Sequence, residues 1–186
     1  MIIGLGYQAR VGKDTVADYL SIHHGFHKRA FADKLKEDCA QVFGLTLEHF
    51  QSPLKEEVLT EWKMTPREVI QRFGQMMKAH WGDYFWVDRM HEFLGARGGF
   101  STEADRRDWV ITDVRFRVEA EAIKSWGGIV VHVDGERREQ LGGNAAAHIS
   151  EHELDGWKGW DYELTNHSDI PDLYARVEVM MNRYSK

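Results

Sequence analysis

The start of the chain carries the pattern that most restricts its fold. Residues 1–6 form a short apolar run, which suits a buried parallel strand, and a turn that contains glycine follows this run. From Lys13 onward apolar residues recur at helical spacing, and Gly25 supplies a stop signal after this stretch. A strand, a glycine turn and a helix in direct succession are typical of α/β folds, whose ligand site lies beyond the carboxyl ends of the strands.

The remaining sequence continues to alternate between strand and helix patterns. Further strands are predicted at residues 26–31, 109–113, 129–134 and 162–165. Further helices are predicted at residues 34–43, 83–96, 118–126 and 172–181, and one more begins at Pro66 with Thr65 as its N-cap. This alternation predicts an α/β fold with a central parallel sheet of about five strands between layers of helices.

Length and charge limit the classes of protein to which the chain can belong. A chain of 186 residues is expected to form a single domain. Its net charge of −6 argues against a protein that coats nucleic acid, because such a surface would be strongly basic. Cys39 is the only cysteine, which indicates a reducing compartment. The sequence has neither an export signal nor an apolar run of membrane-spanning length, so we expect a cytoplasmic protein with no membrane partner.

The turn after the first strand reads GYQARVGKDT, from Gly6 to Thr15. It is close to the phosphate-binding pattern G-x-x-x-x-G-K-[ST], in which backbone N–H groups surround phosphate oxygens while the lysine reaches the outer phosphates. Two positions differ: Tyr7 stands where the first glycine would fall, and Asp14 follows the lysine in place of serine or threonine. Gly6 can replace the missing glycine, and the Asp14 carboxylate can help to hold Mg²⁺ while Thr15 binds a phosphate.

We therefore expect this segment to be an exposed loop that binds the phosphates of ATP through Gly6, Arg10, Val11, Gly12, Lys13, Asp14 and Thr15. A second interpretation is a dinucleotide-binding loop, because residues 4–9 also fit G-x-G-x-x-[GA]. That interpretation gives no purpose to Arg10, Gly12 or Lys13, whereas the phosphate loop uses all three. A plain glycine turn with a surface lysine is the remaining alternative.

Asp113 and Arg115 stand at the end of a later predicted strand, at the sheet edge where the loop opens. A carboxylate there can orient the water shell of Mg²⁺, and an arginine two residues later can make a two-pronged contact with a phosphate. The alternative is an ordinary salt bridge at the end of a strand.

Several segments together resemble the bacteriophage-type deoxynucleoside monophosphate kinases, which have the P-loop nucleoside monophosphate kinase fold. Besides Gly12-Lys13-Asp14-Thr15, they are FADKLK from Phe31, TPR from Thr65 with Gln71 and Gly74, ITDVRF from Ile111 with Glu119, and SEH from Ser150. They follow one another in the family's order from residue 1 to about 180. Tyr7 departs from the family's pattern, as does Arg117-Val118, where the family often has Pro-Asn.

The resemblance implies a single P-loop kinase domain over residues 1–186, a three-layer sandwich with a helical acceptor-binding insertion and a lid. Its core would comprise residues 1–31, 108–134 and 160–186, the acceptor-binding region about 32–100 and the lid about 135–158. The implied reaction transfers a phosphoryl group from ATP, with Mg²⁺, to a deoxynucleoside monophosphate, and it would take place in the host cytoplasm if the chain is viral. Its partners would be these small molecules, and a homodimer is left open.

By the same resemblance, the acceptor would be bound by Phe31, Lys34, Arg67, Gln71 and Glu151. Arg115 would face the acceptor or the transferring phosphate. Arg67 and Gln71 are four residues apart and share a helix face, which otherwise could simply be a solvated face. Arg137 and Arg138 stand in the expected lid, where arginines can stabilise charge on the transferring group; as catalytic candidates they join Lys13 and Arg115. The metal candidates are Asp14 and Asp113.

Other functions remain as alternatives. A kinase of similar fold could phosphorylate another small acceptor, such as dephospho-coenzyme A or phosphomevalonate. A GTP-binding switch is disfavoured because the chain has no N-K-x-D motif. Residues 148–152 match the zinc-peptidase pattern H-x-x-E-H, but the pattern would need a third ligand and a helix. The sequence does not reveal which base the acceptor carries.

Overall fold

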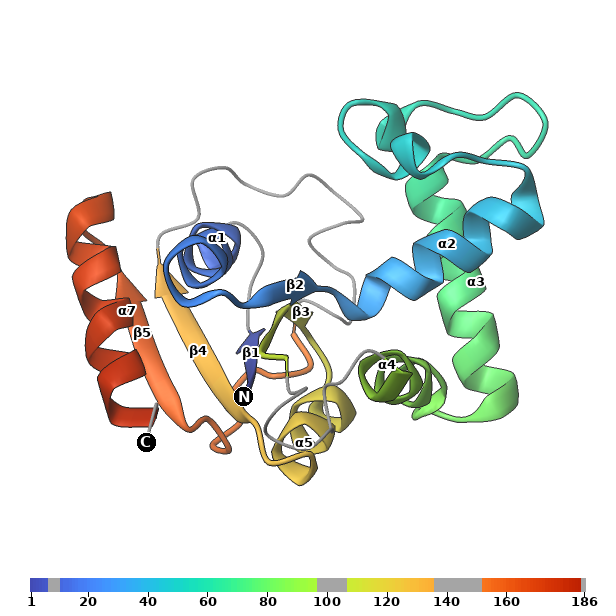
Figure 1. The fold of residues 1–186 in the computed structure, drawn as a ribbon. Coiled ribbons are helices and arrows are strands. Elements are labelled where there is room, and N and C mark those ends of the chain that lie inside the picture. Colours follow the sequence, from blue (N-terminus) through green and yellow to red (C-terminus); the bar gives the residue numbers. More distant parts are fainter. Residues whose placement is uncertain (7–10, 97–106, 136–151, 185–186) are drawn as a thin grey trace. The chain divides into compact units, whose positions relative to one another are not determined.

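The computed structural model describes residues 1–6, 11–96, 107–135 and 152–184 (Figure 1). The chain divides into two compact units, which are described one at a time. The sheet unit comprises residues 1–30 and 94–186, and the helical unit comprises residues 31–93. No helix among the described residues combines the length and the apolar character needed to cross a lipid bilayer.

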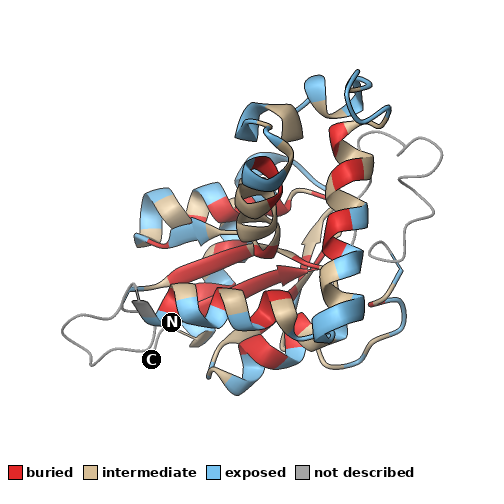
Figure 2. Ribbon diagram, turned by 90° about the vertical axis from the view of Figure 1, so that its right-hand side faces the viewer, coloured by how far each residue is buried: buried red, intermediate tan, exposed pale blue. Residues whose placement is uncertain are grey.

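The sheet unit is built on five parallel strands in the order β2-β3-β1-β4-β5. The strands are β1 (Ile2–Gly6), β2 (His27–Arg29), β3 (Trp109–Val114), β4 (Ile129–Gly135) and β5 (Tyr162–Asn166). Every residue of the central strand β1 is buried, as expected for a parallel strand covered on both faces (Figure 2). The predicted α/β fold with a central parallel sheet of five strands is confirmed.

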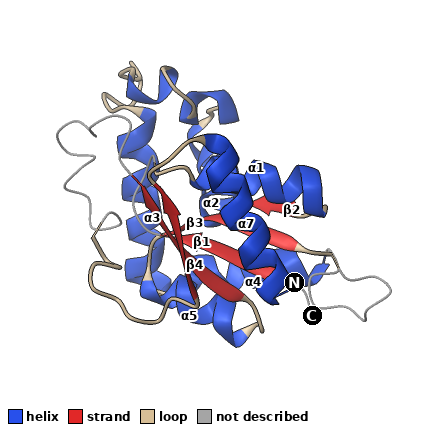
Figure 3. Cartoon of the chain, turned by 90° about the vertical axis from the view of Figure 1, so that its left-hand side faces the viewer, coloured by secondary structure: helices blue, strands red, loops and turns tan. Residues whose placement is uncertain are grey.

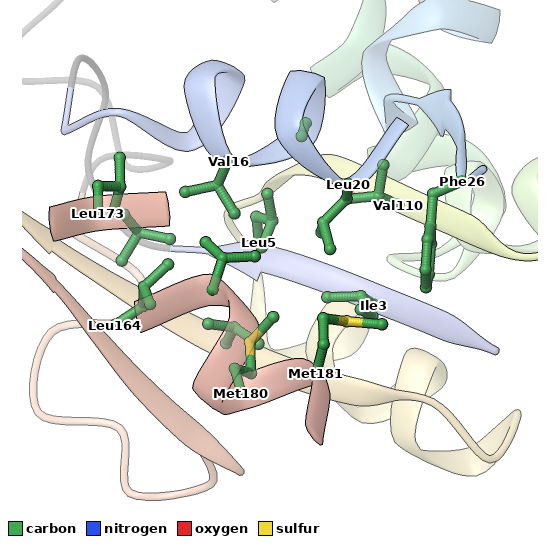
Figure 4. Close-up of a cluster of buried hydrophobic side chains, with 14 of the residues drawn as sticks. Ile3, Leu5, Val16, Leu20, Phe26, Val110, Leu164, Leu173, Met180 and Met181 are labelled. Atoms are coloured by element: carbon green, nitrogen blue, oxygen red, sulfur yellow. The ribbon is translucent and has the colours of Figure 1, made fainter. Parts of the chain in front are cut away.

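Helices cover both faces of this sheet, as Figure 3 shows. One face carries α1 (Lys13–His24) and α7 (Ile170–Tyr184), and the other carries α5 (Arg117–Ser125). Successive side chains of a strand point to opposite faces. Accordingly, Ile3 and Leu5 of β1 belong to the apolar core beneath α1 and α7 (Figure 4). Gly4, between them, lies so close to α5 that a Cβ there would be 2.6 Å from Ile123 Cδ1.

The helical unit contains α2 (Phe31–Phe43), the short 3-10 helices η1 (Leu47–Phe50) and η2 (Leu54–Glu56), α3 (Pro66–Trp81) and most of α4 (Phe85–Ala96). Its core is formed by Cys39, Val69, Phe73 and Trp86. Helices α2 and α3 approach closely at Gly74, where a Cβ would be 3.1 Å from Leu35 Cδ2. The unit therefore has an apolar core of its own.

The start of α3 agrees with the sequence. Pro66 occupies the first turn, and Thr65 caps the helix by accepting a hydrogen bond from the N–H of Glu68 (3.2 Å). The Glu68 carboxylate accepts one from the N–H of Thr65 (2.8 Å), which completes a capping box. The hydrogen bonds that this carboxylate accepts from the N–H and the hydroxyl of Thr65 lower the pKa of Glu68.

Most predicted boundaries differ from the observed ones by one to three residues, and the differences around residue 30 have a clear physical reason. Strand β2 spans only His27–Arg29, and α2 begins at Phe31, three residues before the predicted start at Lys34. Phe31 is only 4% exposed and acts as the first buried residue of the helix. Residues 26–31 were predicted as one strand, but β2 lies at the edge of the sheet and pairs with β3 over three residues only.

A polar cluster joins α1 to α7 and makes stability depend on pH. The hydroxyl of Tyr19 donates to Oε1 of Glu178 (2.8 Å), and Nε2 of His24 lies 2.8 Å from the same oxygen. These contacts, with Tyr19 first, lower the pKa of Glu178 from its ordinary value of 4.5. A lowered carboxyl pKa stabilises the fold above the ordinary pKa, and the contribution is lost as the pH falls through the lower, folded-state pKa.

We therefore expect Glu178→Gln to reduce the free energy of unfolding at pH 7 by less than about 1 kcal/mol. The difference from the unmodified protein should shrink below pH 4.5, as Glu178 becomes protonated in both states. Urea unfolding at pH 7, 5 and 3.5 measures it, with Glu121→Gln on the exposed side of α5 as the control. A constant difference at all three pH values would contradict the expectation.

Candidate active site

The described end of the phosphate loop consists of Val11 and Gly12, which lead directly into α1. Gly12 is the N-cap of α1 and has φ of 101°, a left-handed conformation that glycine adopts without strain. A Cβ at this position would lie 2.3 Å from Nδ2 of Asn166. Both the backbone conformation and the lack of space therefore require glycine at the position that the sequence pattern assigns to it.

The N-terminus of α1 offers the features that an anion needs. The first N–H groups of a helix have no acceptor inside the helix, and the helix dipole makes this end favourable for negative charge. Lys13, Asp14 and Thr15 form the first turn, with Asp14 exposed and Thr15 half-buried. A phosphate chain fits this donor set, since backbone N–H groups and a lysine ammonium all donate hydrogen bonds to anionic oxygens.

The sequence predicts that Lys13 lies on an exposed loop, but in the structure its side chain is buried. Its side chain is only 8% exposed, and it is one of two charged residues among the described ones that are buried. The reason is its place in the first turn of α1, a helix that packs on the sheet with Val16, Ala17 and Leu20. Lys13 is thus held by the fold, which limits the conformations that its ammonium can take.

Asp113 and Arg115 lie beside the start of the phosphate loop. In the β1–β3 pairing, Gly4 is opposite Ile111 and Gly6 is opposite Val114, so β3 contains one extra residue in this interval. Such a bulge is common next to active sites, because it redirects side chains at the end of a strand. The structure thus brings the Asp-Val-Arg segment to the sheet edge where the loop begins.

Glu119 shapes the turn that carries Arg115, a role that the sequence analysis missed. Its carboxylate is 7% exposed and accepts hydrogen bonds from the backbone N–H groups of Arg115 (2.8 Å) and Phe116 (3.0 Å). These are donors at the start of α5 that find no acceptor inside the helix. A glutamate three residues after the helix N-cap is half of a capping box, and this spacing could have revealed the contact.

The acidic residues at the sheet edge fit a magnesium ion that a nucleotide brings with it. No group of three or more His, Cys, Asp or Glu side chains in the described ranges is arranged to hold a metal ion. Magnesium, however, is usually bound by one or two carboxylates together with phosphates and water. Asp14 in the first turn of α1 and Asp113 on β3 can supply those carboxylates.

The predicted acceptor residues in the helical unit are engaged in ion pairs of their own. Nζ of Lys34 lies 2.6 Å from Oδ1 of Asp38 on the next turn of α2. The Arg67 guanidinium contacts Oε1 of Glu56 through Nε (2.9 Å) and Nη2 (2.5 Å). Gln71 is half-buried one turn further along α3. Phe31 is almost wholly buried, as described above. Their role in binding an acceptor stays a prediction.

Four predicted site residues lie outside the described residues: Arg10, Arg137, Arg138 and Glu151. Their assignments stay predictions, as does the extent of the lid. His152, the last residue of the zinc-peptidase pattern, has Nδ1 3.0 Å from Oδ2 of Asp155.

Residues 45–177 match the family model of deoxynucleotide monophosphate kinases. The chain belongs to this family. It is also 29% identical over 185 residues to a putative deoxynucleotide monophosphate kinase of Acanthamoeba polyphaga mimivirus, a match that covers 95% of this chain and 94% of the viral protein. The resemblance is confirmed, and family membership supports a nucleotide kinase over a dinucleotide-binding protein, a GTP switch or a zinc peptidase.

Solved structures support the fold of this family member. A dephospho-CoA kinase from Campylobacter jejuni superposes with a TM-score of 0.53 at 15% identity, covering 98% of this chain and 96% of that chain. A shikimate kinase from Aquifex aeolicus gives a TM-score of 0.50 at 14% identity, covering 100% of this chain and 98% of that chain. At these identities the likeness concerns the P-loop kinase fold alone.

Proposed function

We propose that the chain transfers the γ-phosphoryl group of ATP, with Mg²⁺, to the phosphate of a deoxynucleoside monophosphate and so forms the diphosphate. Two observations carry the proposal: α1 begins with a glycine cap and a lysine, and the Asp113-Val114-Arg115 segment lies beside the end of β1, where Val114 pairs with Gly6. Membership of the deoxynucleotide monophosphate kinase family supports the same reaction.

The donor side of the reaction depends on the phosphate loop. Gly12 allows the backbone to come close to the phosphates, and N–H groups in the first turn of α1 donate to their oxygens. Lys13 places a positive charge at the β- and γ-phosphates, with Thr15 and Arg10 as further contacts. Asp14 and Asp113 would hold magnesium, which would supply positive charge against the charge that develops on the phosphates.

The transfer itself needs no covalent intermediate with the protein. An oxygen of the acceptor's phosphate attacks the γ-phosphorus and forms a new P–O bond. The bond from the γ-phosphorus to the β,γ-bridging oxygen breaks, and ADP leaves with that electron pair. Catalysis of such a step consists mainly of positioning and charge stabilisation. Arg115 would contribute both, because a guanidinium can contact two phosphate oxygens at once.

The acceptor would bind to residues of the helical unit. A nucleoside monophosphate presents a dianionic phosphate and the polar edge of a base, which call for cations and an amide. Lys34, Arg67 and Gln71 are of these types, with Phe31 as a neighbouring apolar group. Arg67 already holds a carboxylate oxygen of Glu56 with two of its nitrogens, and a phosphate oxygen could replace it there. Glu151 would complete this site.

The domain arrangement proposed from the sequence assigns the donor and the acceptor to different regions of the chain. The core around the sheet would bind the donor, and the region of about 32–100 would bind the acceptor. A lid of about 135–158 would close over both substrates and bring Arg137 and Arg138 to the transferring group.

The identity of the product tests the proposal. Purified protein with Mg·ATP should convert at least one of the four common deoxynucleoside monophosphates to its diphosphate, with an equal amount of ADP. The matching ribonucleotides, dephospho-coenzyme A and phosphomevalonate serve as competing acceptors in separate reactions, and chromatography identifies each product. A phosphorylated coenzyme A or mevalonate product without any deoxynucleoside diphosphate would overturn the acceptor assignment. If inorganic phosphate is released from ATP at the same rate in the presence and in the absence of an acceptor, the protein is a simple ATPase.

A further inference from the structure

We propose that Asn166 and Gly135, at the ends of β5 and β4, position the phosphate loop for its ligand by fixing the orientation of the Val11–Gly12 peptide. Neither residue stands in a phosphate-binding motif, and neither would touch the nucleotide in this role. The inference rests on the proposed function, because it assumes that the loop binds the phosphates of ATP.

The first observation is a hydrogen bond across the sheet edge. Nδ2 of Asn166 donates to the carbonyl oxygen of Val11 at 2.8 Å, although the two residues are 155 positions apart in the chain. Val11 is 2% exposed, so its carbonyl group lies where few other donors can reach it. An unmade hydrogen bond at such a place costs more than one at the surface.

This bond decides where the next N–H group points. The C=O and N–H groups of a trans peptide point in opposite directions. With the Val11 carbonyl held toward β5, the N–H of Gly12 points away from β5 and is left free of the strand to donate to a ligand. The Gly12 carbonyl, in turn, accepts the first hydrogen bond of α1, from the N–H of Val16 (3.1 Å). Both peptide groups around Gly12 are therefore fixed by contacts with the fold.

The second observation is the lack of space at Gly135. A Cβ there would lie 2.8 Å from the Val11 carbonyl oxygen and 3.0 Å from the Asn166 carbonyl oxygen, and both are backbone atoms that cannot rotate away. Gly135 pairs with Asn166 at the end of the β4–β5 ladder. Val11 thus lies against the backbone of β4 at Gly135 and against the side chain of Asn166 on β5, and glycine is what permits the first approach.

The strand ends that bear the loop are themselves held in place. Nε2 of His167 lies 2.9 Å from Oδ2 of Asp134, which links the residues just beyond Asn166 and just before Gly135. The hydroxyl of Thr165 accepts a hydrogen bond from Nη1 of Arg176 on α7 (2.8 Å). A positioning residue is effective only if its own site is rigid, and these contacts supply that rigidity.

The test measures binding of ATP and of tripolyphosphate, which has no base, to the Asn166→Leu variant. Leucine is close to asparagine in size but cannot donate to Val11. We expect both dissociation constants to rise by about tenfold or more, because a small displacement of a binding group is costly. The KM for the acceptor should stay unchanged, and the melting temperature should fall by no more than about 4 °C.

Glu163→Gln is the matched control, since it alters an exposed side chain of the same strand, three residues before Asn166, that takes no part in the contacts described above. It should leave the binding of both ligands unchanged. Gly135→Ala, which pushes on the Val11 carbonyl from the other strand, should weaken ATP and tripolyphosphate in parallel with Asn166→Leu. If Asn166→Leu is too unstable to assay, the affinity of Gly135→Ala for ATP and tripolyphosphate tests the proposal.

Two failures can be told apart with Lys13→Met. If that variant loses affinity for ATP while Asn166→Leu and Gly135→Ala bind it normally, Asn166 and Gly135 are merely structural and the inference is wrong. If Lys13→Met also binds ATP and tripolyphosphate normally, the proposed phosphate loop itself is wrong.

Discussion

Lys13→Met is expected to lower kcat/KM for ATP about a thousandfold, in the range found when a group that stabilises transferring charge is removed. Methionine keeps the length and apolar stem of the buried lysine side chain but has no ammonium group to place at the phosphates. Circular dichroism and thermal melting should show an intact fold. Lys13→Ala should lose as much activity and more stability, because it also leaves unfilled space beside a helix packed on the core.

Lys124→Met is the matched control for this prediction. Lys124 on α5 contacts the Gly159 carbonyl and Oδ1 of Asp161, both at 2.7 Å, and belongs to no candidate site. Its loss should reduce stability slightly and leave kcat/KM unchanged. If folded Lys13→Met turns over at a near-normal rate, Lys13 takes no part in the mechanism, and the main function assigned to the loop is wrong.

Arg115→Lys is expected to lower kcat/KM about a hundredfold even though the positive charge remains. An ammonium group is a point charge, whereas the planar guanidinium can contact two phosphate oxygens at once, so the substitution removes the fork and keeps the charge. The turn should stay in place, since Glu119 binds the backbone N–H at this position and not the side chain. Steady-state kinetics with both substrates varied measures the effect.

Arg89→Lys provides the comparison for Arg115. Arg89 on α4 forms an ion pair with Glu92 (2.8 Å), and lysine can maintain such an exposed pair with little loss. If Arg115→Lys and Arg89→Lys both match the unmodified enzyme, Arg115 is a structural residue at a strand end, the alternative that the sequence had left open.

The agreement between sequence and structure is best where the signals are local. The capping box at Thr65 and Pro66, the stop at Gly25 and the strand–loop–helix order at the start of the chain all depend on residues within one or two turns of each other. Local preferences are expressed in any context that does not oppose them. The prediction was less accurate at β2, whose length depends on its pairing with β3 and not on its own residues.

The motifs likewise predicted the location of the candidate site. Gly12 and Lys13 could be singled out because a phosphate-binding turn needs a fixed spacing along the chain. Asp113 and Arg115 could be placed at the same edge because parallel strands end together. In the structure, Val114 between these two residues pairs with Gly6 at the end of β1.

The sequence by itself therefore determined the α/β architecture and the family, and it predicted where a phosphate loop would lie. Only the tertiary structure decided that Lys13 is buried and that Glu119 binds the backbone of the turn that carries Arg115. It also decided that Asn166 and Gly135 contact the Val11–Gly12 segment. The physical reason is distance along the chain. A hydrogen bond between residues 155 positions apart leaves no periodicity or spacing in the sequence, and it exists only because folding brings the ends of β4 and β5 beneath the loop.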